Sequence, residues 1–363
     1  MAMDRCVLVA GASGTVGQAA VRHFEGLGWQ VLALSRRPAA HAGSGRVRQV
    51  QADLRDAAAC RAALDALPAA THLVYAALHE LPGLVAGWRD PAQMTANLAM
   101  LQNLVAPLAA RGALRHVSLL QGTKAYGVHL RPIPVPARER WPRDPHDNFY
   151  WLQEDWLRQA AGRHGFAITI WRPQIVFGEA VGVAMNLLPV LGAHAAICRA
   201  EGRPFAYPGG PGYLSEAVDA GLLARALAWA VDAPAAAGET FNISNGDVFA
   251  WPHVWPVLAE AFGVAAGEPE PLSLAAFLPA KEAAWAEIVA RHGLRPGSLA
   301  ALLGESHHYA DFCLAHGAKR PPPPVLVSTI KLRQAGFPDC IDTEDMFRDH
   351  AAALQAARVL PPV

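Results

Sequence analysis

A short, wholly apolar run followed at once by three regularly spaced glycines constrains this chain more than any other feature. Residues Cys6–Ala10 read CVLVA, and Gly11, Gly14 and Gly17 follow them. An uninterrupted apolar run is typical of a strand that is buried on both faces of a parallel sheet. The glycines permit a tight turn, a close approach of the backbone to a diphosphate, and close packing of a helix on the sheet. We therefore predict that the chain begins with a dinucleotide-binding β–α–β unit.

The rest of the chain continues to alternate apolar strands with helices. This alternation predicts an α/β fold of the Rossmann type, in which helices cover both faces of a doubly wound parallel sheet. After the first strand, we expect strands at residues 29–35, 47–51, 72–76, 114–120, 166–171 and 240–243, and helices at 18–27, 92–111 and 148–163.

Two regions after the sixth strand break this alternation and predict a second, smaller unit. Residues 179–211 are rich in glycine, proline and apolar types, and residues 264–324 are mostly helical in pattern. The prolines at 321–324 predict a stiff connector. We expect a Rossmann domain of residues 1–178 with a return segment at about 212–250, a mostly helical, substrate-covering lobe of residues 179–211 and 251–330, and a C-terminal segment of residues 331–363.

The charge balance argues against two classes of partner. Basic and acidic residues number 31 each, so the net charge is zero. Proteins that bind nucleic acid or anionic membranes normally carry a basic excess, and neither partner is expected here. Residues 180–198 contain no Asp, Glu, Lys or Arg, but Asn186, Pro189 and His194 favour a buried or substrate-facing segment over a membrane span. With no signal-peptide pattern at its start, the chain is expected to be cytoplasmic.

Cysteine and histidine spacing does not suggest a metal or disulfide site. The five cysteines are widely separated and odd in number, and none forms a C-x-x-C pair. His307 and His308 are adjacent rather than one helical turn apart, which is typical of a solvated pair. We expect no metal.

The end of the second predicted strand indicates which dinucleotide binds. An NAD site has Asp or Glu there to hold the ribose 2′-hydroxyl, whereas this chain has Ser35, Arg36 and Arg37. Two guanidinium groups suit a 2′-phosphate, so NADPH is the expected cofactor. Topology places Asp53 near the adenine. The expected cofactor-binding residues are Gly11, Ser13, Gly14, Thr15, Val16, Gly17, Ser35, Arg36, Arg37, Asp53, Leu54, Ala76, Pro173 and Ile175.

The chain lacks the usual proton-donor motif of short-chain dehydrogenases. That motif places a Lys four residues after a Tyr, where its charge lowers the pKa of the phenol. None of the six tyrosines has a Lys at that spacing. Either the chain is a non-catalytic NADP-binding sensor, or the Lys comes from elsewhere in the sheet. Lys124, the only lysine before residue 281, follows the fifth predicted strand, and Tyr150 begins the next helix.

Four segments resemble the progesterone 5β-reductase/iridoid synthase-like family of atypical short-chain dehydrogenases, which belong with the NAD-dependent epimerases and dehydratases. They are GTKAY at residues 122–126, NFYWLQED at 148–155, RPQIVFG at 172–178 and FNISNGDVF at 241–249. The resemblance extends over essentially the whole chain. It implies Tyr150 and Lys124 as the catalytic residues. Two departures are Trp151, where family members often have a second Tyr, and Ala125, where the plant enzymes have a larger residue.

The resemblance implies an NADPH-dependent reductase of α,β-unsaturated carbonyl compounds. Hydride would add to the β-carbon, and the Tyr150 hydroxyl would stabilise the enolate oxygen with Lys124 assisting. Two alternatives are carbonyl reduction and an NADP-sensing scaffold, while a nucleotide-sugar epimerase would need the missing Tyr/Lys motif. A small enone or carbonyl compound is the expected substrate, and a homodimer through residues 92–111 and 148–163 stays open. The expected substrate-binding residues are Trp88, Tyr126, Met185 and Tyr213.

Overall fold

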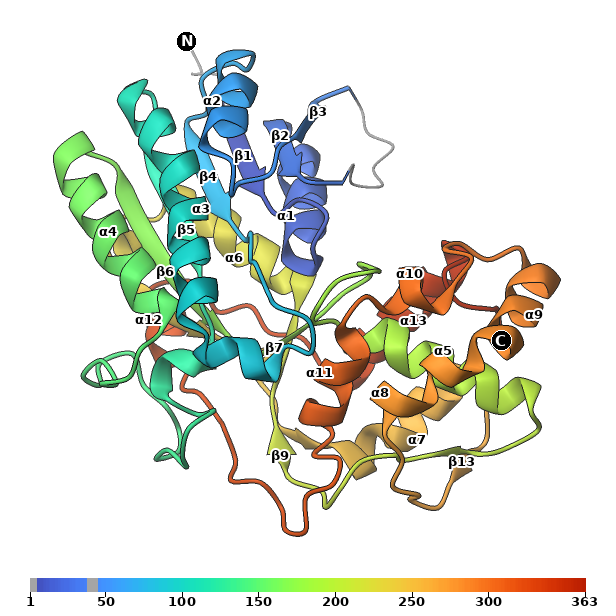
Figure 1. The fold of residues 1–363 in the computed structure, drawn as a ribbon. Coiled ribbons are helices and arrows are strands. Elements are labelled where there is room, and N and C mark those ends of the chain that lie inside the picture. The colour runs from blue at the N-terminus through green and yellow to red at the C-terminus, as the bar shows by residue number, and fades with distance from the viewer. Residues whose placement is uncertain (1–4, 38–44) are drawn as a thin grey trace.

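Seven parallel strands form the central sheet of this protein (Figure 1). The structure is a computed structural model that describes residues 5–37 and 45–363. The strand order β11-β6-β5-β4-β1-β2-β3 reverses direction between β1 and β4, and such a switch point opens a ligand-binding crevice at the carboxyl ends of the strands. The predicted Rossmann-type sheet is thereby confirmed. The strands are β1 (Cys6–Ala10), β2 (Gln30–Ser35), β3 (Val47–Gln51), β4 (His72–Tyr75), β5 (His116–Leu120), β6 (Ala167–Pro173) and β11 (Thr240–Ile243).

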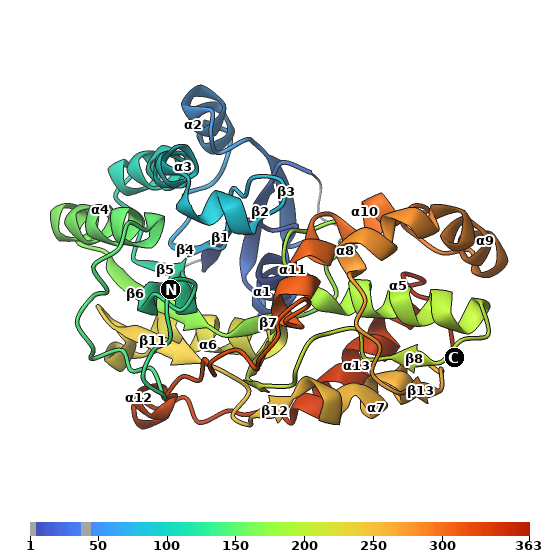
Figure 2. The same ribbon diagram turned by 60° about the horizontal axis from the view of Figure 1, so that its bottom comes forward.

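Helices cover both faces of this sheet because each face carries its own apolar core. Phe24 of α1 (Thr15–Gly26) and Leu227 of α6 (Ala220–Asp232) are buried on one face. Leu101 and Leu157 are buried on the opposite face, which is covered by α2 (Ala57–Asp65), α3 (Pro91–Ala110) and α4 (Phe149–His164). Figure 2 shows these two layers on either side of the strands. The sheet is therefore buried on both sides, as its apolar strands predict.

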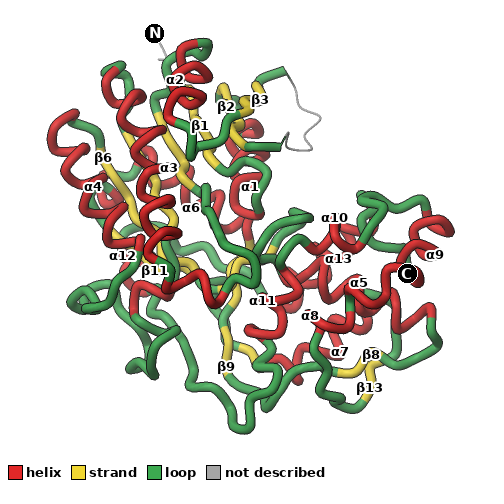
Figure 3. The backbone as a smooth tube through the Cα atoms, in the orientation of Figure 1, coloured by secondary structure: helices red, strands yellow, loops and turns green. Residues whose placement is uncertain are grey.

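Most of the remaining helices build a separate lobe beside the carboxyl edge of the sheet. Figure 3 shows helices and loops making up nearly all of this lobe, while the long strands lie in the other domain. Its core includes the fully buried side chains of Trp251, Trp285 and Phe347. The lobe helices are α5 (Leu187–Ala200), α7 (Trp251–Ala261), α8 (Leu274–Phe277), α9 (Glu282–His292), α10 (Leu299–Leu303), α11 (Ser306–Cys313) and α13 (Thr343–Ala356).

The uncharged stretch at 180–198 enters this lobe as helix α5. Every residue from Leu187 to Cys198 is buried, which explains why the segment carries no charge. Within the described residues, no helix is long and apolar enough to cross a membrane.

The predicted C-terminal segment 331–363 divides between the two units. The buried Leu332 of α12 (Ile330–Gln334) belongs to the core on the α1 and α6 face of the sheet, and α12 packs against β11. Helix α13 instead packs in the lobe, against α7 and α5. The remaining short strands form three pairs: β7 (Ile175–Phe177) with β10 (Ala217–Asp219), β12 (Phe249–Ala250) with β9 (Leu214–Ser215), and β13 (Ala266–Gly267) with β8 (Phe205–Ala206). The 3-10 helices are η1 (Val85–Arg89), η2 (Thr123–Tyr126), η3 (Pro234–Ala236) and η4 (Pro279–Lys281).

Candidate active site

One large cavity extends from the glycine loop to the helical lobe. Its volume is about 1320 Å³, which exceeds the roughly 300–1,000 Å³ of a site for a single small molecule. The cavity lies at the carboxyl ends of the strands, where the strand order reverses. It therefore has room for a dinucleotide and a second ligand together.

The glycine loop, residues 11–17, makes close backbone contacts where it lines the cavity. Gly11 has φ +83°, and a Cβ atom there would lie 2.7 Å from the carbonyl oxygen of Ala76. A Cβ on Gly17 would lie 2.1 Å from the carbonyl oxygen of Gly11, so neither position accepts a side chain. Gly14 is the N-cap of α1, and no acidic side chain occupies the first turn of that helix. The free N–H groups at this helix start suit a diphosphate, and Ser13, Thr15 and Val16 line the same wall.

The predicted adenosine-binding residues gather along the neighbouring wall. Ser35, Arg36, Arg37, Asp53 and Leu54 all line the cavity. The Asp53 carboxylate accepts hydrogen bonds from Arg55, which lower its pKa to about 2, and Arg36 adds a smaller effect in the same direction. The Arg37 guanidinium donates to the carbonyl oxygen of Gly182 at 2.9 Å. Arg37 therefore contacts the lobe as well as the cavity.

Tyr150 brings a buried hydroxyl group to the centre of the cavity. It lies in the first turn of α4, where the Asn148 side chain caps the helix by accepting from the Tyr150 backbone N–H at 3.0 Å. Burial raises the pKa of the Tyr150 phenol, the Glu80 charge raises it further, and the Arg172 charge opposes both. The phenol is therefore neutral at physiological pH and can donate a hydrogen bond.

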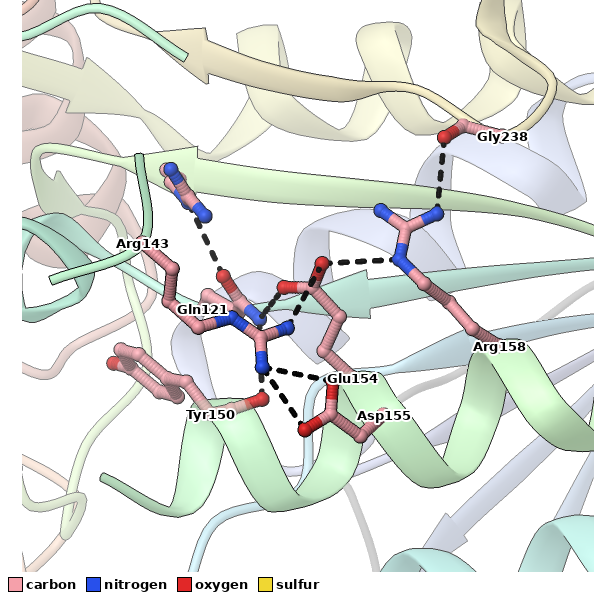
Figure 4. Close-up of polar contacts among 8 residues, drawn as sticks. Gln121, Arg143, Tyr150, Glu154, Asp155, Arg158 and Gly238 are labelled. Carbon is pink, nitrogen blue, oxygen red and sulfur yellow. Dashed lines mark hydrogen bonds and ion pairs between the residues drawn. The ribbon is translucent and has the colours of Figure 1, made fainter. Parts of the chain in front are cut away.

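A polar network holds the helix beneath Tyr150 (Figure 4). Glu154, one turn after Tyr150, stands where the usual motif has Lys. Its carboxylate accepts from Gln121 at 3.1 Å and from Arg158 at 3.0 Å. Gln121 also accepts from the Arg172 guanidinium at 3.2 Å. Glu154 thus connects α4 to the ends of β5 and β6.

Lys124 faces the same cavity from η2, where its side chain contacts Trp88 and Glu80. Its Nζ lies 4.1 Å from the centroid of the Trp88 ring and 3.9 Å from Glu80 Oε1. Burial lowers the pKa of Lys124, and the Glu80 charge opposes this effect. Lys124 is therefore the ion-pair partner of Glu80 in the cavity, and the cation that lowers the pKa of Tyr150 is Arg172.

Most of the predicted contact residues line the cavity, and one does not. Its lining includes the predicted residues Trp88, Met185, Tyr213, Ala76, Pro173 and Ile175. Tyr126 lies outside the cavity lining. Its buried hydroxyl donates to Asn242 Oδ1 at 2.7 Å, and its ring packs against Trp141.

Several cavity residues were not predicted from the sequence. Tyr309, Phe312 and Cys313 reach the cavity from α11, and the Tyr213 hydroxyl donates to the Cys313 carbonyl oxygen at 2.6 Å. His307 also lines it: this residue is half-buried, and its Nδ1 atom is buried without a hydrogen-bond partner among the described residues. Among the described residues, no group of three potential metal ligands comes together. Glu80 could have been found from its position just after β4, at the carboxyl edge of the sheet.

This fold, with its glycine loop and buried tyrosine, defines a dinucleotide-dependent protein of the short-chain dehydrogenase and epimerase class. Residues 7–244 match the model of the NAD dependent epimerase/dehydratase family. The chain belongs to this family and, within it, to the progesterone 5β-reductase/iridoid synthase-like group, as its motifs predict.

Two curated relatives support this assignment. The (S)-8-oxocitronellyl enol synthase of Antirrhinum majus is 32% identical over 314 residues, covering 80% of this chain and 78% of the relative. The 3-oxo-Δ(4,5)-steroid 5-beta-reductase of Arabidopsis thaliana is 31% identical over 318 residues, covering 82% and 80%. Among solved structures, the UDP-glucose 4-epimerase of Thermus thermophilus in complex with NAD has a TM-score of 0.65 at 19% identity, covering 97% and 99%, which supports the fold alone.

Proposed function

We propose that this protein is an NADPH-dependent reductase of α,β-unsaturated carbonyl compounds. The observation that carries the proposal is the neutral, buried Tyr150 hydroxyl in a cavity that begins at a dinucleotide-binding glycine loop. The relative from Arabidopsis thaliana is named for reduction of a double bond conjugated to a 3-oxo group, which is an enone. The same chemistry fits the residues present in this chain.

The residues of this chain would hold the carbonyl oxygen while the carbon–carbon double bond is reduced. Bound NADPH supplies the hydride, which adds to the β-carbon. Tyr150 donates a hydrogen bond to the carbonyl oxygen, and this bond strengthens as the oxygen becomes an enolate. Burial keeps the proton on Tyr150, so the group acts as a donor. Solvent then protonates the α-carbon, and Lys124 assists as a cation of the same cavity.

Removal of the Tyr150 hydroxyl is the direct test of this role. Tyr150→Phe keeps the ring packed against Phe149 but removes the donor. We expect the kcat for enone reduction to fall roughly 10²–10³-fold while the Kd for NADPH stays within about twofold. A variant with near-normal kcat would show that another group stabilises the enolate.

The product identifies the reaction class. The purified protein would be incubated with NADPH and 2-cyclohexen-1-one, and the product analysed by gas chromatography. We expect cyclohexanone. Cyclohex-2-en-1-ol would instead establish carbonyl reduction, and tight NADPH binding without turnover of an enone panel would establish an NADP-sensing scaffold.

The choice of NADPH over NADH rests on the charge beside β2. The strand ends in Ser35, and Arg36 and Arg37 follow in place of the carboxylate that an NAD site requires. Arg36 gives the cleaner test because Arg37 also binds Gly182. We expect Arg36→Ala to raise the KM for NADPH at least about tenfold and to leave that for NADH nearly unchanged. An equal effect on both cofactors would contradict a 2′-phosphate contact.

A further inference from the structure

Helix α11 brings a second phenol to the cavity from the lobe. Figure 1 shows α11 on the side of the lobe that faces the sheet. Tyr309 of this helix lines the cavity together with Phe312 and Cys313, and its side chain packs against the lobe core. Tyr150 lines the same cavity from α4 of the Rossmann domain. The two phenols therefore reach one cavity from two different units.

The Tyr309 ring is fixed by its neighbours while part of the residue stays open to the cavity. The ring lies nearly parallel to the Phe312 ring, with 6.4 Å between centroids and 17° between planes. Tyr309 is half-buried and belongs to the cavity lining, so its accessible surface faces the cavity. Its hydroxyl lies beside the Cys313 thiol, and a thiol is a weak hydrogen-bond partner. The Tyr309 proton is therefore available to a ligand.

The electrostatic surroundings keep Tyr309 protonated and place it near Tyr150. Burial raises the pKa of the Tyr309 phenol well above its usual range, and the charges of Cys313, Tyr213 and Tyr150 raise it further. Each of these side chains therefore lies within electrostatic reach of the Tyr309 hydroxyl. Tyr213 is itself committed, because its hydroxyl donates to the Cys313 carbonyl oxygen at 2.6 Å. The lobe thus offers one neutral phenol, Tyr309, beside the place where Tyr150 would hold a carbonyl oxygen.

Reduction of an enone needs a proton at the α-carbon as well as a hydrogen bond at the oxygen. Addition of hydride to the β-carbon leaves an enolate, whose electron pair is shared between the oxygen and the α-carbon. For hydride transfer, the plane of the enone must lie against the cofactor ring on the Rossmann side of the cavity. The other face of the enone is then turned toward the lobe. A proton donor on the lobe can reach the α-carbon on that face.

We propose that Tyr309 delivers the proton to the α-carbon, on the face opposite to the one that receives the hydride. This role rests on the proposed enone reduction. The enolate electron pair forms the new carbon–hydrogen bond, the O–H bond of Tyr309 breaks, and the phenolate takes a proton from water. The transfer is favourable because a ketone is a much weaker acid at its α-carbon than a phenol is. Solvent is the final source of the proton, and Tyr309 determines the face to which it is added.

The configuration of the α-carbon tests this role. Reduction of 2-methyl-2-cyclohexen-1-one gives 2-methylcyclohexanone, whose stereocentre is created by α-protonation alone. Chiral gas chromatography measures the enantiomeric excess. We expect a large excess of one enantiomer from the wild-type protein and a nearly racemic product from Tyr309→Phe. Hydride transfer, followed as the loss of NADPH absorbance in a single turnover, should stay within about threefold of the wild-type rate, because Tyr150 still holds the oxygen.

Tyr207→Phe is the matched control. Tyr207 is a buried tyrosine of the same lobe that lies outside the cavity lining, and its hydroxyl donates to the Leu314 carbonyl oxygen at 3.2 Å. Its loss should leave the enantiomeric excess at the wild-type value. Thermal unfolding and the Kd for NADPH, measured by fluorescence titration, should agree for Tyr309→Phe and the wild-type protein. A merely structural role for Tyr309 would change these two quantities and leave the enantiomeric excess high.

Deuterium labelling checks the face of protonation independently, and decides alone if the methyl group prevents turnover. Reduction of 2-cyclohexen-1-one in D₂O with deuterium-labelled cofactor places one deuterium at carbon 2 and one at carbon 3. These atoms should be trans in the wild-type product and a cis/trans mixture in the product of Tyr309→Phe. A cis product from the wild-type protein would place the donor on the cofactor side and overturn the proposal.

Three other outcomes also overturn the proposal. They are a racemic wild-type product, an unchanged enantiomeric excess in Tyr309→Phe, and a loss of enantiomeric excess confined to His307→Gln, which would assign the proton to the other α11 side chain of the lining. Turnover without a stereochemical change refutes only the role of Tyr309. Absence of turnover with every enone refutes the proposed function and this role together.

Discussion

At the scale of single residues, Gly122 controls the position of the Tyr150 hydroxyl. A Cβ at this position would lie 3.2 Å from that oxygen and 3.8 Å from the carbonyl oxygen of Pro173. The φ of Gly122 is 174°, so the backbone itself would accept any residue. The absence of a side chain therefore provides space for the hydroxyl.

This contact predicts that Gly122→Ala damages turnover more than stability. The added methyl group should displace the Tyr150 hydroxyl by a few tenths of an ångström, and small errors in the position of a catalytic group are costly. We expect kcat to fall roughly 10-fold or more with a Tm change of less than about 3 °C. Gly162→Ala is the control, because a Cβ there meets nothing within 4 Å. Equal kcat values for the two variants would contradict this role of Gly122.

The sequence identified the candidate catalytic pair but not its surroundings. Scarcity of Lys and a position after a parallel strand pointed to Lys124, a helix start pointed to Tyr150, and the family resemblance implied their catalytic roles. The contact between Lys124 and Glu80 joins two different βα loops, so no local pattern reveals it. Tyr126 lies outside the cavity lining although it is only two residues from Lys124, because residues at that spacing in a 3-10 helix point in different directions.

At the scale of elements, the buried end of α4 depends on Glu154. This carboxylate is 9% exposed and joins Gln121 to Arg158 and Arg143 (Figure 4). Replacement by Leu would leave the buried amide of Gln121 without its main acceptor. An uncompensated buried polar group costs more than the hydrogen bond itself contributes.

We therefore expect Glu154→Leu to lower the free energy of unfolding by about 2 kcal/mol. Urea denaturation followed by circular dichroism measures this change. Asp155→Asn is the comparison, because Asp155 is 54% exposed and its pair with Arg143 should contribute less than about 0.5 kcal/mol. If the two variants lose the same free energy of unfolding, the buried Glu154 contributes no more to stability than an exposed charged residue does.

Elements with a strong local pattern were predictable, and their packing partners were not. Most of the strands follow from apolar runs, although β3 reads VRQVQ, and the helix expected at 148–163 is observed as α4 with Asn148 as its cap. Helix α13 has an amphipathic pattern that suits any apolar surface, and only the assembled lobe shows where Met346 and Leu354 are buried. The predicted C-terminal segment therefore divides between two cores, because α12 packs against β11 and α13 packs against α7 and α5.

At the scale of the whole molecule, a partly buried ionic cluster joins the Rossmann domain to the lobe. His350 of α13 contacts Asp219 at 2.7 Å and Glu179 at 3.5 Å, and Arg22 of α1 pairs with Glu179 at 3.2 Å. Burial lowers the pKa of His350, but the hydrogen bonds and charges of Asp219 and Glu179 outweigh burial and raise it to about 9. His350 is therefore protonated at neutral pH, and its positive charge stabilises the contact between the two units.

This cluster predicts a loss of stability between pH 6.5 and about pH 9. The pKa of His350 is raised on folding, so its contribution is complete below pH 6.5 and disappears as the pH rises through about 9. Within that interval the folded state holds a proton that the unfolded state has released, and the free energy of unfolding should fall by up to about 1.4 kcal/mol per pH unit.

Comparison with His350→Gln isolates this effect from the other buried groups between pH 6.5 and 8.5. His72, His116 and His194 have pKa values lowered to about 4, chiefly by burial, so they are neutral in the folded protein, while in the unfolded chain they still release protons near pH 6.5, equally in both proteins. The pKa of Cys6 is raised by burial to about 11 from 9, and its effect on stability is likewise common to both proteins. Urea denaturation from pH 6.5 to 8.5 should therefore show the free energy of unfolding of the wild-type protein falling relative to that of His350→Gln. Parallel curves for the two proteins would show that His350 is not charged at the junction.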